Sequence, residues 1–278
     1  MTSPTTLLAR VRSSGRAATL VALAAALVVA FVAAPGPLAA SRPGGGPSDA
    51  RQLAGTFRES FVAYWGSGAG DLSPGLRGVV DYWFRYHVAK ALIAAILLVV
   101  LGALGVLTWR AVLRPGARSA WWRAGLASAG ALVTGLGLLS LVTVMANIQG
   151  AVAPFASLLP MLTDGPADPR LAATLAQVRQ QLAGSHGAPA VDVMVGDVAH
   201  YHVAMAVIAG IVAAVLAVAG VASWRRFART ARAERRLGAS AGLLAVLLSL
   251  VMTVVAVANA TTAAHSAPAL LALFEGGR

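Results

Sequence analysis

The chain has 278 residues, of which 58% are hydrophobic and only 12% are charged, and its mean hydropathy is +0.75. Soluble domains carry roughly 25% charged residues, so this composition excludes an ordinary soluble protein and predicts an integral membrane protein. The chain has no cysteine, which excludes disulfides, cysteine-ligated metal centres and a thiol nucleophile. Its net charge of +12 would suit either nucleic acid or a membrane surface, and the distribution of that charge separates the two.

The segment 1–34 combines a basic start with an apolar run. Three arginines precede an uncharged stretch at 17–34. Both a secretory signal peptide and a first transmembrane helix have this layout, but the apolar region of a signal peptide is only about 7–15 residues long, shorter than this run. The best cleavage point also has a large residue, Leu38, where a small one is preferred. We therefore favour a retained transmembrane helix, a signal anchor, over a cleaved signal peptide.

Residues 35–85 are predicted to form a linker followed by an amphipathic helix. The stretch 35–47 is so rich in proline and glycine that no regular structure is expected there. Across 48–65, aromatic and aliphatic side chains recur at helical spacing, with charged residues between them. A helix of this kind lies in the membrane interface or packs on the ends of spanning helices.

The sequence Tyr-His-Val-Ala occurs twice, at 86–89 and 201–204, and each copy opens a long apolar segment. Both segments end at a Trp-Arg pair, at 109–110 and 224–225, so the spacing from tyrosine to tryptophan is the same in both copies. An Ala-Asn pair closes the next apolar segment in each copy, at 146–147 and 258–259, slightly closer to its Tyr-His in the second. We therefore predict two transmembrane hairpins, 86–147 and 201–260, that form a parallel internal repeat.

The connection 148–200 contains a second predicted amphipathic helix. Asp168 and Pro169 have the residue types of an N-cap and a first helical position, and apolar side chains follow at helical spacing as far as position 182. The tail 261–278 is short and mostly apolar. The predicted fold class is therefore all-α, a polytopic membrane protein with five transmembrane helices.

Basic residues gather in three segments: before the first span, between the second and third spans, and between the fourth and fifth. These segments hold thirteen arginines and one glutamate, whereas the rest of the chain holds nine basic and nine acidic residues. The positive-inside rule makes the basic side cytoplasmic. We therefore expect a multi-pass protein of a bacterial cytoplasmic membrane, with its N-terminus inside and its C-terminus and both amphipathic helices outside. The basic segments suit anionic lipids rather than nucleic acid.

Two histidines stand at equivalent positions of the repeat, His87 and His202. Histidine is a common ligand of haem iron and of metal ions, so a cofactor held between the two side chains is one hypothesis. The alternative is that both belong to the aromatic belt that marks a membrane interface. We favour the belt, and we assign no cofactor from sequence.

Three further polar residues lie within or at the ends of the predicted spans. Lys90 is the only charged residue inside a span, near its outer end, where its ammonium group can reach the interface. Asn147 and Asn259 occupy equivalent repeat positions. We favour anchoring for the lysine, and helix capping or interhelical hydrogen bonding for the asparagines. The alternative is that the three line an outer vestibule.

The sequence contains no His-Glu-x-x-His zinc motif and no phosphate-binding Gly-x-x-x-x-Gly-Lys loop. Its one Gly-x-Ser-x-Gly match, at 238–242, lies at the start of the last apolar span rather than at the strand-to-helix turn that this motif needs for catalysis. We therefore expect no enzymatic activity. The favoured function is that of a membrane component acting through helix packing and its extracytoplasmic surface, as an accessory subunit with a membrane-protein partner. The alternatives are a transporter or permease subunit that uses the repeat interface, and a membrane carrier of haem or metal.

Overall fold

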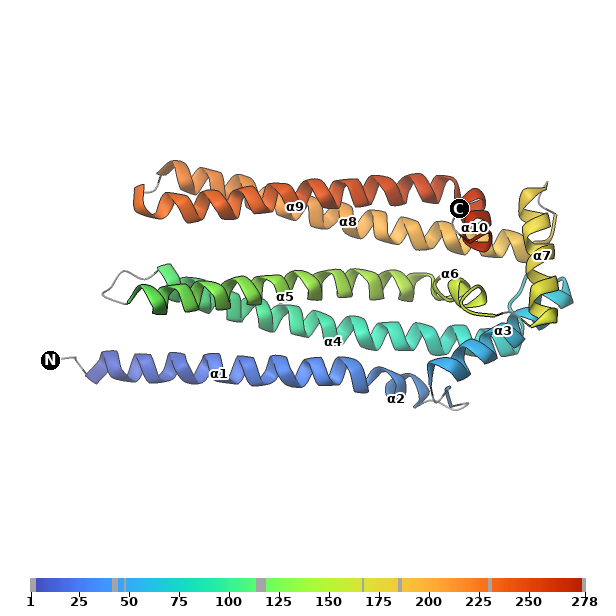
Figure 1. The fold of residues 1–278 in the computed structure, drawn as a ribbon, viewed down its shortest axis with the longest axis horizontal. Coiled ribbons are helices and arrows are strands. Elements are labelled where there is room, and N and C mark those ends of the chain that lie inside the picture. Colours follow the sequence, from blue (N-terminus) through green and yellow to red (C-terminus); the bar gives the residue numbers. More distant parts are fainter. Residues whose placement is uncertain are drawn as a thin grey trace. The chain divides into compact units, whose positions relative to one another are not determined.

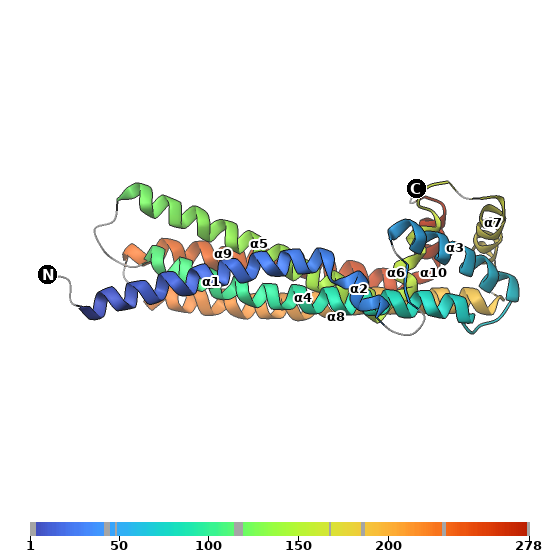
Figure 2. The ribbon, with the colours of Figure 1, turned by 90° about the horizontal axis from the view of Figure 1, so that it is seen from below.

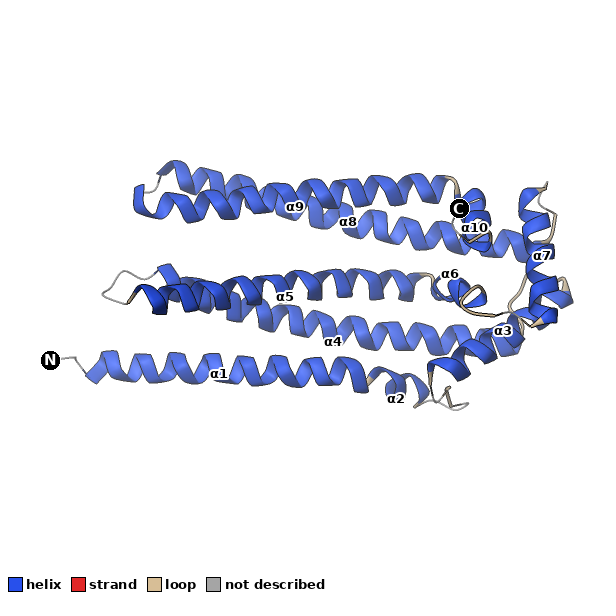
Figure 3. Ribbon diagram, viewed as in Figure 1, coloured by secondary structure: helices blue, strands red, loops and turns tan. Residues whose placement is uncertain are grey.

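Every described segment of appreciable length in the computed structural model is helical, and no strand occurs among the described residues (Figures 1 and 3). These residues are 4–41, 45–47, 49–113, 119–166, 168–184, 187–229 and 232–276. The helices are α1 (Pro4–Ala33), α2 (Pro35–Ala40), α3 (Ala50–Ser67), α4 (Pro74–Leu113), α5 (Ala120–Val152), α6 (Pro154–Leu158), the 3-10 helix η1 (Leu159–Leu162), α7 (Pro169–Ala183), α8 (Pro189–Arg229), α9 (Arg232–Ala264) and α10 (Ser266–Phe274).

Five of the described helices, α1, α4, α5, α8 and α9, are long and apolar enough to cross a membrane. The predicted all-α fold with five such helices is therefore confirmed. A bilayer core of about 30 Å needs about 20 helical residues, and α4 and α8 have 40 and 41. Each of these two helices begins at a proline, a residue suited to the first helical position because it lacks the N–H group that would have no partner there.

Three helix starts differ from the expectation. The sequence predicts no regular structure across 35–47, but the first part of this stretch forms the short helix α2. Proline is tolerated there because the first residues of a helix need no N–H donors. The helices α4 and α8 also start twelve residues before Tyr86 and Tyr201, in segments that the sequence assigns to the connections. The repeated Tyr-His therefore lies inside each helix rather than at its start.

The helix boundaries recur at equivalent positions of the two sequence copies. Pro74 opens α4 and Pro189 opens α8, each at the same spacing from its Tyr-His. The helices α5 and α9 have 33 residues each, and Asn147 and Asn259 stand at the same place within them. A short helix, α6 or α10, begins after a single intervening residue in both cases. We call α4 and α5 the first hairpin, and α8 and α9 the second hairpin.

The chain divides into two compact units. The first comprises Met1–Pro37 and Ala89–Val144, and the second comprises Leu38–Val88 and Met145–Arg278. In the first unit, the Ser140 hydroxyl donates to the Ala94 carbonyl at 2.9 Å, and the Trp109 indole N–H donates to the Thr134 hydroxyl at 3.2 Å. These bonds join α4 to α5. In the second unit, α8 and α9 lie side by side along their length (Figures 1 and 2).

The second unit also contains five short helices, α3, α6, η1, α7 and α10, which we call the helical cap. The main cluster of buried apolar side chains lies in the cap and in the adjoining starts of α4 and α8. Phe57, Phe61 and Tyr64 of α3 are fully buried, and the rings of Phe57 and Tyr64 meet the Phe155 ring of α6 edge to face. Tyr64 lies outside the spans, and burial, with a smaller contribution from nearby Asp71, raises the pKa of its hydroxyl.

Side-chain hydrogen bonds tie the elements of the cap together. The Arg58 guanidinium on α3 donates to the carbonyls of Met161 and Asp164, which lie in and just after η1. Arg179 on α7 donates to the Phe274 carbonyl of α10 at 3.3 Å. Hydrogen bonds from a charged donor are among the stronger ones, so Arg58 holds the η1 segment against α3, and Arg179 holds α10 against α7.

Candidate functional site

The repeated histidines and asparagines form two pairs, one within each hairpin. His87 Nδ1 lies 3.0 Å from Asn147 Oδ1, and His202 Nδ1 lies 2.9 Å from Asn259 Oδ1. An amide oxygen can only accept, so each Nδ1 acts as the donor. The sequence relates histidine to histidine and asparagine to asparagine across the repeat. The structure instead brings each histidine to the asparagine of its own hairpin.

The antiparallel course of each hairpin explains these pairs. The histidine lies in the first half of the first helix and the asparagine in the second half of the second, so both stand in the half of the hairpin that is remote from its turn. Asn147 is only 7% exposed, so its amide needs partners within the protein. Asn259 is half-buried and its Nδ2 also donates to the Val255 carbonyl at 2.9 Å. Neither asparagine ends its helix, so capping, one of the two favoured expectations, does not apply.

The surroundings of the two histidines differ. A Cβ atom placed on Gly150 of α5 would lie 2.6 Å from His87 Nε2, so the His87 ring lies directly on the helix backbone at this glycine. The Trp83 ring also meets the His87 ring edge to face, with centroids 4.7 Å apart. In the second hairpin the position equivalent to Gly150 is Thr262, whose hydroxyl donates to the Ala258 carbonyl of its own helix at 3.0 Å.

A glutamine that the sequence analysis did not single out connects the first hairpin to the second. Gln149, two residues after Asn147, is 5% exposed, and its Nε2 donates to the Tyr201 carbonyl of α8 at 3.1 Å. Tyr201 directly precedes His202, so this bond lies beside both histidine–asparagine pairs. The sequence offers no signal for this bond, because a glutamine at the end of an apolar segment is as compatible with exposure as with burial.

This arrangement restricts what the histidines can bind. The His87 ring faces α5 through both nitrogens, because Nδ1 bonds Asn147 and the Nε2 edge lies on Gly150. A haem iron or metal ion at Nε2 would therefore require the ring to leave its place. No group of three or more His, Cys, Asp or Glu side chains that could hold a metal occurs in the described part of the chain.

Lys90 lies in the first unit, against α1. Its Nζ is 4.5 Å from the centre of the Phe31 ring, a cation–π geometry. The lysine is partly exposed. Of the three residues considered for an outer vestibule, Lys90 thus contacts an aromatic ring of α1, whereas Asn147 and Asn259 each contact a histidine.

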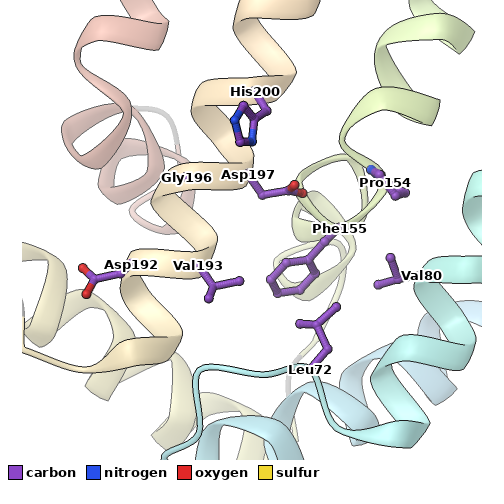
Figure 4. Close-up of a pocket in the computed structure, with 9 residues that line it drawn as sticks. All are labelled: Leu72, Val80, Pro154, Phe155, Asp192, Val193, Gly196, Asp197 and His200. Atoms are coloured by element: carbon purple, nitrogen blue, oxygen red, sulfur yellow. The ribbon is translucent and has the colours of Figure 1, made fainter.

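An open pocket of about 360 Å³ lies between α6, α8 and the start of α4 (Figure 4). The Phe155 ring lies among its apolar side chains, and Asp197 extends from α8 toward α6, where its carboxylate accepts the Ala156 N–H at 2.7 Å. Asp197 is thus engaged in holding α6 to α8. The lining residues are Leu72, Val80, Pro154, Phe155, Asp192, Val193, Gly196, Asp197 and His200.

The chain matches no protein-family model, and comparisons with curated proteins and with solved structures find no significant match. The functional interpretation therefore depends on the residues and their geometry.

Proposed function

We propose that this chain is a non-enzymatic, multi-pass component of a bacterial cytoplasmic membrane that works as an accessory subunit and presents the helical cap to a membrane-protein partner. The observation that carries the proposal is the contrast in burial. The cap has a continuous apolar core. In the most apolar stretch of each span, by contrast, at most 28% of the residues are buried, and in α1 and α9 the buried share is 0%. Long apolar faces that the protein itself leaves uncovered are covered by lipid or by other helices.

The proposed arrangement includes duplication of the hairpins. Three kinds of contact recur at equivalent positions of the two copies and support it: the histidine–asparagine bonds, the contacts of Gly105 and Gly220 with the facing helix, and a tryptophan on a glycine. In the last of these, Trp109 lies on Gly130 and Trp224 lies on Gly242. A repeat whose copies enter the membrane from the same side is a parallel one, with a pseudo-two-fold axis along the membrane normal.

The proposed orientation puts the basic turns of both hairpins in the cytoplasm and the cap, with α3 and α7 as amphipathic helices, outside. The distribution of thirteen arginines against one glutamate on one side supports it. A reporter active only outside the cytoplasm, fused after position 278, is expected to be active. A fusion after position 229, next to the second basic turn, serves as the control and is expected to be silent.

Crosslinking tests the subunit proposal. A photoactivatable residue at exposed Glu59 of the cap is expected to capture one discrete protein at native expression, because this position faces away from the cap core. The same residue at Val218 of α8, which is 70% exposed, is the matched position on a span and is expected to capture lipid. Recovery of the chain without a protein partner from both positions would contradict the proposal.

The haem carrier remains the alternative with the most direct test. Expression with haem available, followed by an absorption spectrum of the purified protein, should show no Soret band, because His87 lies on Gly150. A band that is lost in both His87→Ala and His202→Ala would instead establish the carrier and overturn the favoured function.

A further inference from the structure

The turn end of the first hairpin presents two exposed indoles. Trp121 and Trp122, in the first turn of α5, are 88% and 58% exposed. Trp65, Trp83 and Trp109 donate their indole N–H to Gln177, Ser157 and Thr134. The indoles of Trp121 and Trp122 have no acceptor among the described residues. A tryptophan with an apolar ring and an N–H that needs an acceptor suits the layer between hydrocarbon and headgroups.

Two arginines stand at the same end of this hairpin. Arg110 is in the last turn of α4 and Arg123 is in the first turns of α5, and both are exposed. The contact of Trp109 with Gly130 holds the last turns of α4 against α5, about two helical turns after Arg123 along α5. The sequence 110–123 contains no acidic residue, so the segment offers no counter-ion to its own guanidinium groups.

We propose that Arg110, Trp121, Trp122 and Arg123, which we call the Trp-Arg end, form a binding site for the headgroup of an anionic phospholipid in the bilayer. A guanidinium group presents parallel N–H donors that match a phosphate, and the indoles occupy the glycerol and carbonyl layer beside it. This site deepens the proposed membrane function and rests on the placement of α4 and α5 in the bilayer, but it does not depend on the partner of the cap.

The combination of charge and exposed rings identifies the source of the phosphate. Free phosphate would be bound by the arginines but would leave both indoles uncovered. Nucleic-acid bases stack on aromatic rings, but the place of these indoles at the end of a long apolar helix favours a lipid. The second hairpin lacks this combination, because the positions equivalent to Trp121 and Trp122 hold Ala233 and Glu234. The site is therefore specific to the first hairpin.

Fluorescence quenching tests the site in the full chain. The protein is reconstituted into nanodiscs that contain equal mole fractions of brominated phosphatidylglycerol or brominated phosphatidylcholine. The signal of Trp121 and Trp122 is the difference between the unmodified chain and the W121F/W122F variant. We expect phosphatidylglycerol to quench this signal more strongly. The R110Q/R123Q variant should have a weaker preference for phosphatidylglycerol over phosphatidylcholine. Each lost arginine should reduce this preference about five-fold, since one basic residue near an anionic surface contributes about 1 kcal/mol.

The control is R51Q/R77Q, which removes the same charge from two exposed arginines on α3 and α4 outside the site. This variant should retain the lipid preference, and an unchanged thermal unfolding midpoint in all variants shows that they are folded. Equal quenching by the two lipids, or equal loss in both double variants, would overturn the proposal. So would competition by inorganic phosphate alone, which would identify an adventitious anion site. None of these results depends on whether the cap captures a partner.

Discussion

The first and second hairpins share their contacts but differ in what surrounds them. Both place a histidine on an asparagine and a tryptophan on a glycine, at equivalent positions. The glycine beneath His87, however, is Gly150 in the first hairpin, and its equivalent in the second is Thr262. The shared contacts maintain the spacing of the two helices in each hairpin, and in the first hairpin the glycine also lets the His87 ring pack directly on the α5 backbone. The first hairpin is thus the more tightly packed at its histidine end.

Replacing the histidines should give the largest difference between the hairpins. His87→Ala removes a ring packed on Gly150 and Trp83 and takes the donor from the buried Asn147 oxygen. The expected loss of stability is about 3 kcal/mol, from the cavity and the hydrogen bond together. For His202→Ala we expect a loss of about 1 kcal/mol, because Asn259 is half-buried and can turn to solvent or lipid headgroups.

Thermal unfolding of the purified full chain measures this difference. His87→Asn is the matched variant, since its amide can still donate to Asn147 without filling the space over Gly150, and it should recover part of the loss. Equal losses for both alanine variants would show that the two histidines have equivalent roles.

The pattern of the sequence predicted the five long apolar helices, but not which side chains pair between them. Long apolar runs identify membrane helices because the bilayer core admits few polar groups. Which side chains then meet depends on how far each helix extends beyond the apolar run and on the rotation of each helix, and neither follows from hydropathy. His87 and Asn147 lie 60 residues apart, and only the observed register of α4 on α5 brings them within 3.0 Å.

The short helix α2 and the buried Gln149 were also not predicted from the sequence. The proline and glycine content of 35–47 argues against a helix, yet α2 forms at its start, where the chain continues directly from α1. Sequence reasoning misses Gln149 because nothing in its local sequence distinguishes it from a solvent-exposed residue at the end of a helix. Its bond to Tyr201 is a tertiary contact between hairpins, and no local pattern encodes such a contact.

A side chain at Gly150 should disturb the first hairpin in particular. Gly150→Ala places a Cβ atom 2.6, 2.7 and 2.8 Å from three His87 ring atoms, and the ring cannot move freely because Asn147 and Trp83 hold it. Overpacking of this kind costs about 1–3 kcal/mol. Thr262→Ala is the equivalent change in the second hairpin, and its effect should stay within about 0.5 kcal/mol.

Unfolding midpoints of the two variants give the comparison. The double variant H87A/G150A is the decisive measurement, because removing the ring should relieve the clash. The destabilisation by Gly150→Ala should then nearly vanish on the H87A background, and a full additive loss would contradict the packing of His87 on Gly150.

Replacing the glycine beneath each tryptophan by alanine should also destabilise the first hairpin more than the second, but with a smaller difference in stability between the two variants. A Cβ atom on Gly130 would lie 3.0 Å from Trp109 Cε2, whereas one on Gly242 would lie 3.3 Å from Trp224 Nε1. Gly130→Ala should therefore destabilise by about 1 kcal/mol, while in Gly242→Ala the helix preference for alanine offsets the milder contact. A larger loss in Gly242→Ala would reverse the ranking of the two hairpins.

Replacing Lys90 should give the smallest change in stability of the variants considered. The change is specific to the first hairpin, because the equivalent position in the second holds Met205. Lys90→Met gives the first hairpin the residue of the second and removes the cation–π contact with Phe31 of α1. A contact of this kind contributes about 0.5–1 kcal/mol at exposed sites, so single-variant stability alone is a weak test. A double-mutant cycle with Phe31→Leu isolates the coupling between the two side chains. We expect a coupling of the same size, and Lys90→Arg should retain it, since arginine binds aromatic faces as well. A coupling near zero would mean that Lys90 acts only by reaching the interface, and α1 would then need another contact to hold it against the first hairpin.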